Sequence, residues 1–481
     1  MAYQHGVYVS ETATSIVPAV NTTAGLPVVF GTAPLHLATD PAAANKPVLC
    51  YTYAEAVQQL GYSKDWESYT LCEVIYSQFA LYGYSPVVFV NVLDPDTHKE
   101  SVENEELTVT SGVATIDAPV ILSTLKVMSA TDGDALTADT DYTAAYDDDE
   151  VLNITVLDDG ALADASTIYV TYDKLDPTAV TTDDIIGGVD SETAANLGLE
   201  TLDDVFTNFG LVPGIVLAPG WSDKPAVCAV MQTKASSINS HFKAVVLADV
   251  PTDEVTKYTD VSAWKSDNGY TGEDLAVCWP MATMDGDKYH LSTHLLGALS
   301  SVDAANDDIP FESPSNKTAN VDGLCLADGT EISLGLDQAN YLNGQGVITA
   351  INFMGGWKIW GNRTGCYPDN TDVKDSFLCV RRMFNWHAST FIQTYWAKVD
   401  KPINKRLIQT VIDSENIRLN GLVAQGALLG GRVEFLESEN STTNLLDGII
   451  TFHTYLTPPV PARVIENTIE YDPSYFSELF S

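Results

Sequence analysis

The residues most suited to chemistry are two histidines and two short acidic turns. His290 and His294 lie four residues apart in a segment with helical spacing, so they could offer two metal ligands on one helix face. No third ligand is identifiable, and we interpret both as ordinary helix residues. The turns at 285–287 (Asp-Gly-Asp) and 369–372 (Asp-Asn-Thr-Asp) carry oxygen ligands that calcium prefers. Neither has the spacing of an EF-hand loop, so we interpret them as solvated turns and expect no metal and no cofactor.

Catalytic motifs do not appear in the sequence. It contains no GxSxG, no HExxH, no GxxxxGK[ST] and no GxGxxG after an expected strand. Ser, His and Asp are present, but their spacing nominates no triad. His387 falls on the apolar side of its expected helix, as a core histidine does. We therefore predict that the protein is not an enzyme, with a hydrolase on an α/β domain as a remote alternative.

Composition and charge exclude several classes of partner. The chain has 481 residues, of which 45% are hydrophobic, so it is long enough for several domains with real cores. Its net charge of −41 argues against nucleic acid and against an anionic membrane surface as partners. No apolar run is long enough to span a bilayer, and no secretion signal is visible. The seven cysteines lie mostly in apolar stretches, so we expect buried, reduced thiols in a protein made in a cytoplasm.

The acidic residues are unevenly distributed. Residues 101–200 contain 22 Asp and Glu against two cations, Lys126 and Lys174, for a net charge of −20. Residues 357–481 contain 12 of the 24 cations against 14 acids. A polyanionic middle and a nearly balanced C-terminal quarter indicate two different environments.

The hydrophobic pattern predicts an interrupted α/β core. Buried strands are expected at 26–33 and 86–93, with helices between them, and strands alternate with helices again from 191 to 299. This alternation is typical of a mainly parallel sheet covered on both faces. Between the two parts, residues 94–189 consist of short β-branched runs separated by Asp, Gly and Thr turns. We interpret them as an inserted β-rich module with an acidic surface.

The C-terminal part is predicted to contain two long helices. The first covers 375–398, and its core-facing positions are Phe377, Val380, Phe384, His387, Phe391 and Tyr395. The second begins with Asp400 as N-cap and Pro402 in its first turn, and it runs to about 428. Its expected buried face is Ile403, Leu407, Ile408, Val411 and Ile412. Strands follow at 432–435 and 448–455, and then a proline-stiffened connector at 457–461.

Each end of the chain carries a short alternating strand with no obvious local partner, at 6–11 and within 462–471. A lone strand leaves its backbone hydrogen bonds unmade. Each could fold back onto its own domain or add to a sheet edge of another subunit. The pattern alone leaves both options open.

An ordered set of motifs resembles the contractile-tail sheath family of bacteriophages, tailocins and related injection systems. The resemblance starts at Gly6–Glu11 (GVYVSE), Ile16-Val17-Pro18 and Val28–Ala33 (VVFGTA). It continues through Gly187–Asp190 (GGVD), Leu211–Gly220 (LVPGIVLAPG), Ala244–Asp249 (AVVLAD) with Val250-Pro251, and the block 381–471. No single motif is diagnostic, but together they cover most of the chain outside 94–189.

The resemblance implies a multidomain α/β and α+β fold. A subtilisin-like but non-catalytic α/β sheath domain would join a C-terminal α+β sheath core, an inserted β-rich outer domain and extended terminal arms. The expected parts are an N-terminal arm and linker (1–24), the first part of the α/β core (25–93), the acidic insertion (94–189), the α/β domain (190–355), the tube-facing C-terminal domain (356–459) and the C-terminal arm (460–481).

The resemblance also implies sites and partners. The N-terminal arm that pairs between subunits would be Gly6, Val7, Tyr8, Val9, Ser10 and Glu11, and the C-terminal arm Val464, Ile465, Ile469, Glu470 and Tyr471. Cations of the second C-terminal helix are the expected contacts with the tail tube, namely Lys401, Lys405, Arg406 and Arg418, together with Gln409. Partners would be further copies in stacked rings of six, the tail tube protein, and the baseplate and tail terminator proteins, without nucleic acid or membrane insertion.

The resemblance places the protein in the sheath of a virion tail, assembled in the cytoplasm of the bacterial host. The sheath would contract and drive the tube through the bacterial envelope. A tailocin or another contractile injection system is the alternative, which the sequence does not separate from a phage. A soluble surface or adhesion protein would require a secretion route, and none is visible.

Overall fold

The computed structural model describes residues 24–480. The centre of the molecule is an eight-stranded sheet of order β2-β3-β1-β12-β13-β14-β19-β20. The inner strands β3, β1, β12, β13, β14 and β19 are parallel, and β2 and β20 add antiparallel at the two edges. The strands are β1 (Pro27–Gly31), β2 (Pro47–Cys50), β3 (Val87–Asn91), β12 (Ile215–Leu217), β13 (Val245–Asp249), β14 (Leu275–Cys278), β19 (Val347–Asn352) and β20 (Trp357–Trp360).

Helices cover both faces of this sheet, because successive residues of each strand point to opposite sides. Val28, Val216 and Val246 join one core, whereas their neighbours Val29 and Leu217 join the other. The helices of the first face are α4 (Leu202–Phe209), α5 (Pro225–Ala235) and α6 (Val261–Asp267), and those of the second are α1 (Tyr53–Leu60) and α7 (Leu291–Ala305), with α2 (Thr70–Tyr76) contributing to both cores. The expected parallel sheet with two covered faces is confirmed.

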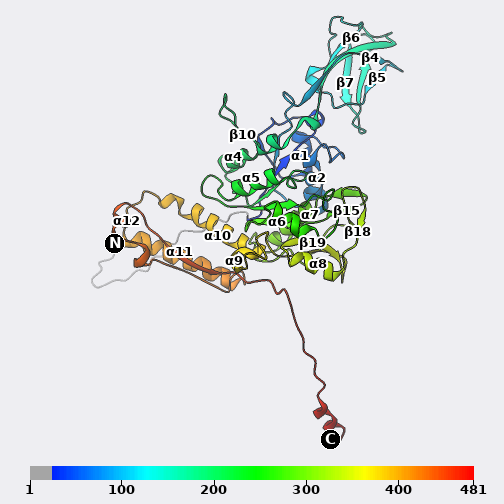
Figure 1. The fold of residues 1–481 in the computed structure, drawn as a ribbon. Helices are drawn as coiled ribbons and strands as arrows, with labels where there is room; N and C mark the ends of the chain where they lie inside the picture. The colour runs from blue at the N-terminus through cyan, green and yellow to red at the C-terminus, as the bar shows by residue number, and fades with distance from the viewer. Residues whose placement is uncertain (1–23, 481) are drawn as a thin grey trace, which may run out of the picture.

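Residues 99–175 form a separate β unit at one end of the molecule (Figure 1). It contains two three-stranded sheets, β4-β9-β6 and β5-β8-β7. Its core is its own and includes Ile154, Ile168 and Val170, all fully buried. The strands are β4 (Lys99–Thr108), β5 (Val113–Ile116), β6 (Lys126–Met128), β7 (Tyr142–Tyr146), β8 (Leu152–Val156) and β9 (Thr167–Leu175).

Small elements complete the body. Below the edge of the main sheet lies a four-stranded sheet of order β16-β15-β17-β18. The small elements of the body, those of this sheet included, are α3 (Thr182–Ile186), β10 (Gly188–Val189), β11 (Asn196–Leu197), β15 (Met281–Met284), β16 (Asp287–Tyr289), β17 (Gly323–Cys325), β18 (Glu331–Ile332) and α8 (Leu336–Asn343). All seven cysteines are buried and free, as expected.

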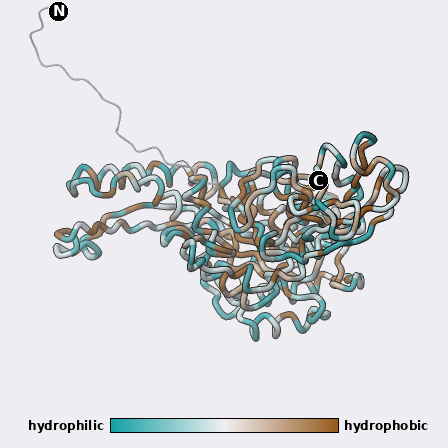
Figure 2. The backbone as a smooth tube through the Cα atoms, turned by 90° about the horizontal axis from the view of Figure 1, so that it is seen from above, coloured by the Kyte–Doolittle hydropathy of each residue, from teal (hydrophilic) through white to brown (hydrophobic). Residues whose placement is uncertain are grey.

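The C-terminal domain projects from one side of the body as helices and a hairpin (Figures 1 and 2). Its sheet consists of two antiparallel strands, which pair from Gly430 with Thr457 to Glu434 with His453. Its elements are α9 (Val373–Ser376), α10 (Leu378–Tyr395), α11 (Lys405–Ala424), β21 (Gly430–Glu434), α12 (Thr442–Leu446) and β22 (His453–Thr457).

The single helix expected over 375–398 is interrupted at Phe377. This residue is extended (φ −110°, ψ 123°) between α9 and α10. The Arg363 guanidinium lies 3.7 Å from the centre of the Phe377 ring, and the two residues form a β-bridge. The bridge requires an extended backbone at this position, so a continuous helix is not possible.

The second helix begins later than predicted. Asp400 has a φ of 63°, so it cannot adopt the extended conformation of an N-cap. Asn404 is the N-cap instead, and its Oδ1 accepts from the Leu407 amide at 2.9 Å. Pro402 and Ile403 therefore precede the helix. The buried residues of α11 are Val411, Ser414, Glu415, Leu419 and Leu422, so of the predicted face only Val411 is fully buried.

The C-terminal domain is attached to the body by buried ion pairs. Arg382 of α10 bonds through two nitrogens to the Asp303 carboxylate at the end of α7, with Nη1 to Oδ1 at 3.0 Å. The Arg382 and Asp303 side chains are 1% and 5% exposed. Next to this pair, Arg381 Nε lies 3.2 Å from Asp274 Oδ1, just before β14. Two adjacent arginines thus join α10 to the body at two points, the end of α7 and the start of β14.

We predict that Asp303→Ala destabilises the subunit strongly. The substitution leaves the Arg382 guanidinium buried without its counter-charge, which typically costs about 3–5 kcal/mol. Denaturant titration of the soluble subunit measures the free energy of unfolding. Lys64→Ala is the control, because Lys64 and its partner Asp287 are exposed, and its loss should change stability by less than about 1 kcal/mol. Equal effects of the two substitutions would contradict the role of the buried pair.

Candidate functional site

The two histidines of the expected metal pair have separate partners. His290 precedes α7, and its Nδ1 lies 2.8 Å from Glu73 Oε2. His294 is fully buried one turn later, with its Nδ1 3.0 Å from the Tyr82 hydroxyl. Burial lowers the pKa of His294 to about 3, so this ring is neutral. Within residues 24–480, no group of three or more His, Cys, Asp and Glu side chains is arranged to hold a metal ion.

The expected acidic turns have structural partners. The Asp285 amide donates to Asp322 Oδ2 at 2.8 Å, which ties the turn between β15 and β16 to the start of β17. Asp372 is the N-cap of α9, and its Oδ1 accepts from the Lys374 amide at 2.9 Å. Both turns therefore organise the local backbone.

A cleft lies at the carboxyl ends of the parallel strands, where α/β proteins commonly bind ligands. Glu73, Asp249 and His290 line it. Ser292 Oγ donates to Asp249 Oδ2 at 2.5 Å, and the Ser292 amide donates to Asp249 Oδ1 at 3.0 Å. His290 bonds to Glu73, and among the described residues no serine hydroxyl bonds to it. The cluster joins α2, β13 and α7, and it lacks the bond between base and nucleophile that a triad requires.

Burial and charge oppose each other in this cluster. Burial alone would lower the pKa of His290, but the nearby carboxylates, Glu73 first and then Asp249 and Asp223, together outweigh it and raise that pKa to about 9. Desolvation raises the pKa of the Asp249 carboxyl to about 6. Near neutral pH, the protonated His290 is therefore the cation that holds Glu73 in place.

The C-terminal domain offers surfaces of a different kind. In the part of the chain that the structure describes, β21 and β22 pair only with each other. The outer edge of β21 is covered by α11, because the Asn416 side chain bonds to both the amide and the carbonyl of Val433, so β22 is the strand whose outer edge could bind a further strand. Such an edge is suited to the binding of extended segments from other chains.

The C-terminal arm is extended and makes no strand in the described structure. Ile465 and Ile469 are each 87% exposed, although their alternation predicts a strand. Val464, Glu470 and Tyr471 are exposed too. The segment leads away from the body (Figure 1). A strand pattern without a ladder is expected where the partner strand belongs to another molecule.

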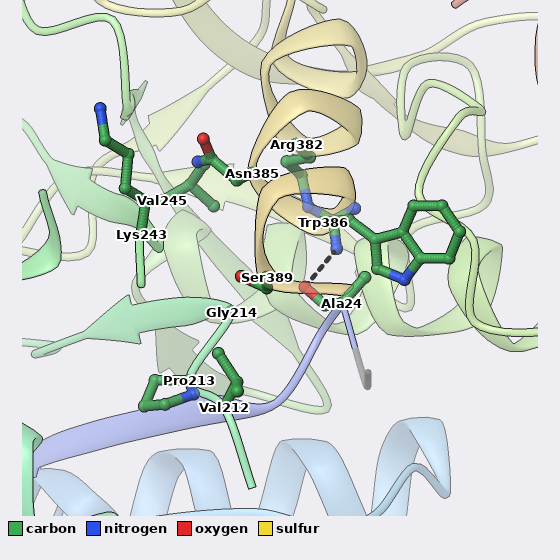
Figure 3. A pocket seen from close by; sticks show the side chains of 10 residues that line it. All are labelled: Ala24, Val212, Pro213, Gly214, Lys243, Val245, Arg382, Asn385, Trp386 and Ser389. Carbon is green, nitrogen blue, oxygen red and sulfur yellow. Dashed lines mark hydrogen bonds between the residues drawn. The ribbon is translucent and has the colours of Figure 1, made fainter. Parts of the chain in front are cut away.

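The proposed N-terminal arm, Gly6 to Glu11, lies outside the described residues. The described chain starts at Ala24, against the first turns of α10 (Figure 3). Arg382 Nη2 donates to the Ala24 carbonyl at 3.4 Å. A Cβ at Gly214 would lie 2.2 Å from the same carbonyl oxygen, so this close approach requires glycine. The arginine that holds Asp303 thus also holds the entrance of the chain into the body.

The five candidate tube contacts separate into two groups. Lys401, Lys405, Arg406 and Gln409 are exposed, and Gln409 donates to Asp413 at 2.8 Å. Lys401 precedes α11, so the prediction that it lies on this helix is wrong. The Arg418 side chain is only 12% exposed and faces inward.

The charge of Arg418 is neutralised within the domain. Its Nη2 lies 2.9 Å from Glu415 Oε2 and 2.5 Å from His387 Nδ1. Burial, and then the Arg418 charge, lower the pKa of His387 to about 3, so His387 accepts as a neutral ring. His387 is the core histidine that the sequence indicates, and Arg418 is its donor.

Sequence reasoning missed the anchoring arginines. Arg381 and Arg382 stand side by side in an otherwise apolar helical segment, and two cations on a buried face require carboxylates opposite them. That signal was present, but the sequence does not reveal that the partners are Asp274 and Asp303, 79 or more residues away.

Comparison with known proteins finds that the chain is similar to tail sheath proteins. The chain is 26% identical over 487 residues to the tail sheath protein of Burkholderia phage BcepMu, across 97% of this chain and 96% of that protein. The chain is therefore similar to a phage tail sheath protein along nearly its whole length. The tail sheath protein of Escherichia phage P2 is 24% identical over 59% of this chain and 69% of its own length. No protein-family model matches the chain.

Solved sheath structures share its fold. The contracted sheath complex of the extracellular contractile injection system PVC aligns with a TM-score of 0.59 over 98% of this chain and 99% of that chain, at 14% identity. The contracted helical sheath of the anti-feeding prophage aligns with a TM-score of 0.57 over 97% and 99%, also at 14% identity. The chain therefore has a mixed α/β multidomain fold like that of these sheath structures. In its described part, no helix combines the length and apolarity that a membrane span needs.

We predict that stability falls between pH 6.5 and 9 because of His290. The stabilisation from its charge is complete below its usual pKa of 6.5 and is lost as the pH rises through about 9. The loss should be at most about 3 kcal/mol, since the ring is partly exposed. Thermal unfolding across this range measures it.

Glu73→Gln removes the carboxylate that holds the proton and should flatten this dependence. Asp249 titrates near pH 6, below this range, so it does not contribute to the slope. Glu67→Gln is the matched control, because Glu67 is 90% exposed and should leave the slope unchanged. Parallel curves for Glu73→Gln and the unaltered protein would contradict the assignment.

Proposed function

We infer that the protein is a subunit of a contractile sheath, of a phage tail or of a contractile injection system. The observation that carries this inference is the sequence similarity to a phage tail sheath protein along nearly the whole length of both chains. The shared fold with two contracted sheaths supports it.

We propose that the subunits stack as rings of six around a tail tube and that contraction drives the tube through the bacterial envelope. The baseplate, the tube protein and the tail terminator would be its partners, and assembly would take place in the host cytoplasm. The body would move nearly as a unit, because its sheet has two fully packed faces. Energy would be stored in the extended lattice at assembly, so that no nucleotide is required.

We propose that residues 6–11 and 464–471 pair as strands with neighbouring copies. The outer edge of β22 supports this for the C-terminal arm, because in the described structure β22 pairs only with β21. Each backbone bond contributes about 1 kcal/mol net, so several per arm would hold neighbours together during contraction. The domain boundaries expected at residues 94, 189, 355 and 459 are part of this proposal. The separate core of residues 107–172 supports an inserted domain there.

We propose that the α/β domain is a non-catalytic scaffold of subtilisin-like type. The bonds of His290 to Glu73 and of Ser292 to Asp249 support a structural role for the groups in the cleft. The hydrolase alternative requires one serine that a covalent serine-hydrolase probe labels cleanly. We expect no such labelling.

We predict that Ile465→Pro with Ile469→Pro abolishes sheath assembly. Proline removes the amide donor from a pairing strand, whereas this arm has no ladder within the monomer that could be lost. Electron micrographs of the purified protein should show tubes for the unaltered chain and none for the variant. Ile465→Val with Ile469→Val is the control, because it keeps the donors and the strand preference. Tubes from the proline variant would contradict arm exchange, and no tubes from any of these chains would contradict the sheath function itself.

We predict that Lys405→Glu with Arg406→Glu weakens assembly on the tail tube. Both side chains are exposed on the first turn of α11. Their positive charges would attract an acidic tube surface, and glutamates at the same positions should repel it. Co-assembly should require about tenfold more tube protein, while polymers of the sheath protein alone form normally. Lys46→Glu with Lys257→Glu makes the same change of net charge at exposed sites of the body. If tube-free polymers are lost equally, the two residues have a structural role.

A further inference from the structure

The outer end of the C-terminal domain carries a groove with apolar walls. It lies between the end of α10, the first half of α11 and residues 448–452. The residues that give it its apolar character are Phe391, Tyr395, Val399, Ile403, Ile449 and Phe452. Val399 is 62% exposed and Ile449 is 49% exposed. Exposed apolar residues that gather around one groove are typical of an interaction site.

The groove has a positive rim. Lys398 and Lys401 line it, with Asp400 between them, and the exposed Lys405 and Arg406 follow on α11. Four cations and two exposed acids, Asp400 and Asp447, therefore lie in or next to the segments that line the apolar floor, in a chain whose overall net charge is −41. The occupant should combine apolar side chains with negative charge.

The last residues of the chain have this composition. The segment Pro473–Phe480 forms 3-10 turns at the end of the arm, and its Tyr475, Phe476, Leu479 and Phe480 are 55–92% exposed. Glu478 lies within this segment, the other three acids (Glu466, Glu470 and Asp472) lie in the arm just before it, and residues 465–480 contain no Lys, Arg or His. This tail, defined as residues 473–480, lies beyond the strand pattern of the arm and is not needed for strand pairing.

The geometry favours a groove on another copy. The arm begins beside Gly426, at the C-terminal end of α11, because Pro459 to Val464 share a pocket with Gly426 and Arg363. The groove is at the opposite end of α11, whose 20 residues span about 30 Å. Residues 465–475 would have to run back along this whole length almost fully extended, at about 3.3 Å per residue. Instead the arm points away from α10–α12 (Figure 1).

We propose that the apolar tail of one subunit, with the acidic end of the arm before it, docks into the apolar, positively rimmed groove of a second copy of this chain. This rests on the proposed function, since it adds a side-chain anchor to the proposed backbone pairing of the arm. Aromatic side chains in a groove give an extended arm a fixed end point, whereas backbone pairing alone leaves its register weakly specified.

A disulfide between two copies tests the docking. One full-length copy carries Val399→Cys in the groove, and a second, differently tagged copy carries Ser477→Cys in the tail, which keeps all four tail anchors. The seven native cysteines are buried, so the new thiols are the accessible ones. After assembly and mild oxidation, a non-reducing gel should show a dimer that contains both tags.

The matched control replaces Val399→Cys with Ile417→Cys, which is on an exposed face of α11 outside the groove. It should give about tenfold less dimer. Adding Phe476→Ser and Phe480→Ser to the tail copy should lower the groove dimer by a similar factor, because both anchors are lost.

Three results would overturn the proposal. The first is equal dimer from positions 399 and 417. The second is an internal disulfide, with no dimer, in a single chain that carries both Val399→Cys and Ser477→Cys. The third is no dimer in tubes that form normally, which would leave the groove to another partner such as the tube protein. If no tubes form at all, the proposed sheath function is contradicted, and the same gel is run on the concentrated mixture of the two copies. A dimer there still supports docking, and the absence of a dimer overturns it.

Discussion

The ion pairs that Arg381 and Arg382 form with Asp274 and Asp303 are the interactions on which the arrangement of the molecule depends. They are buried, so removal of one partner leaves a charge in a region that water does not reach. They fix α10, and with it the whole C-terminal domain, to the end of α7 and the start of β14. Arg382 also holds the Ala24 carbonyl, where the described chain enters the body. Any force that arrives through the arms would pass to the sheet at this point.

The molecule combines a stiff centre with an exposed C-terminal arm. The central sheet alternates its side chains between two cores, so both faces are packed and a relative shift of strands would disrupt both cores. The arm from 464 to 480 is exposed along its whole length. This division suits a subunit that moves as a body while its extremities stay joined to other copies. The acidic β unit has its own core and carries much of the negative charge at one end of the molecule (Figure 1).

The errors of sequence interpretation have a common cause. Phe377 lies in the helical pattern, but it bridges Arg363 and becomes extended. Asp400 has the residue type of an N-cap, but its left-handed backbone excludes that role. Arg418 is predicted to be a surface cation, yet the Glu415 carboxylate neutralises it inside the domain and the neutral His387 ring accepts a hydrogen bond from it. In each case a contact with another part of the chain, or a backbone conformation, overrides a correct local preference.

The sequence by itself determined the interrupted α/β core, the acidic β-rich segment, the buried thiols and the family resemblance. These follow from periodicity, composition and the order of motifs, which are local properties that a linear pattern retains. Only the tertiary structure decided which carboxylates neutralise Arg381 and Arg382, that His290 belongs to Glu73 and not to His294, and that an apolar groove lies at the opposite end of α11 from the arm. Such facts depend on residues that are far apart in the chain and meet only when the sheet and its helices are packed, so no spacing in the sequence encodes them directly.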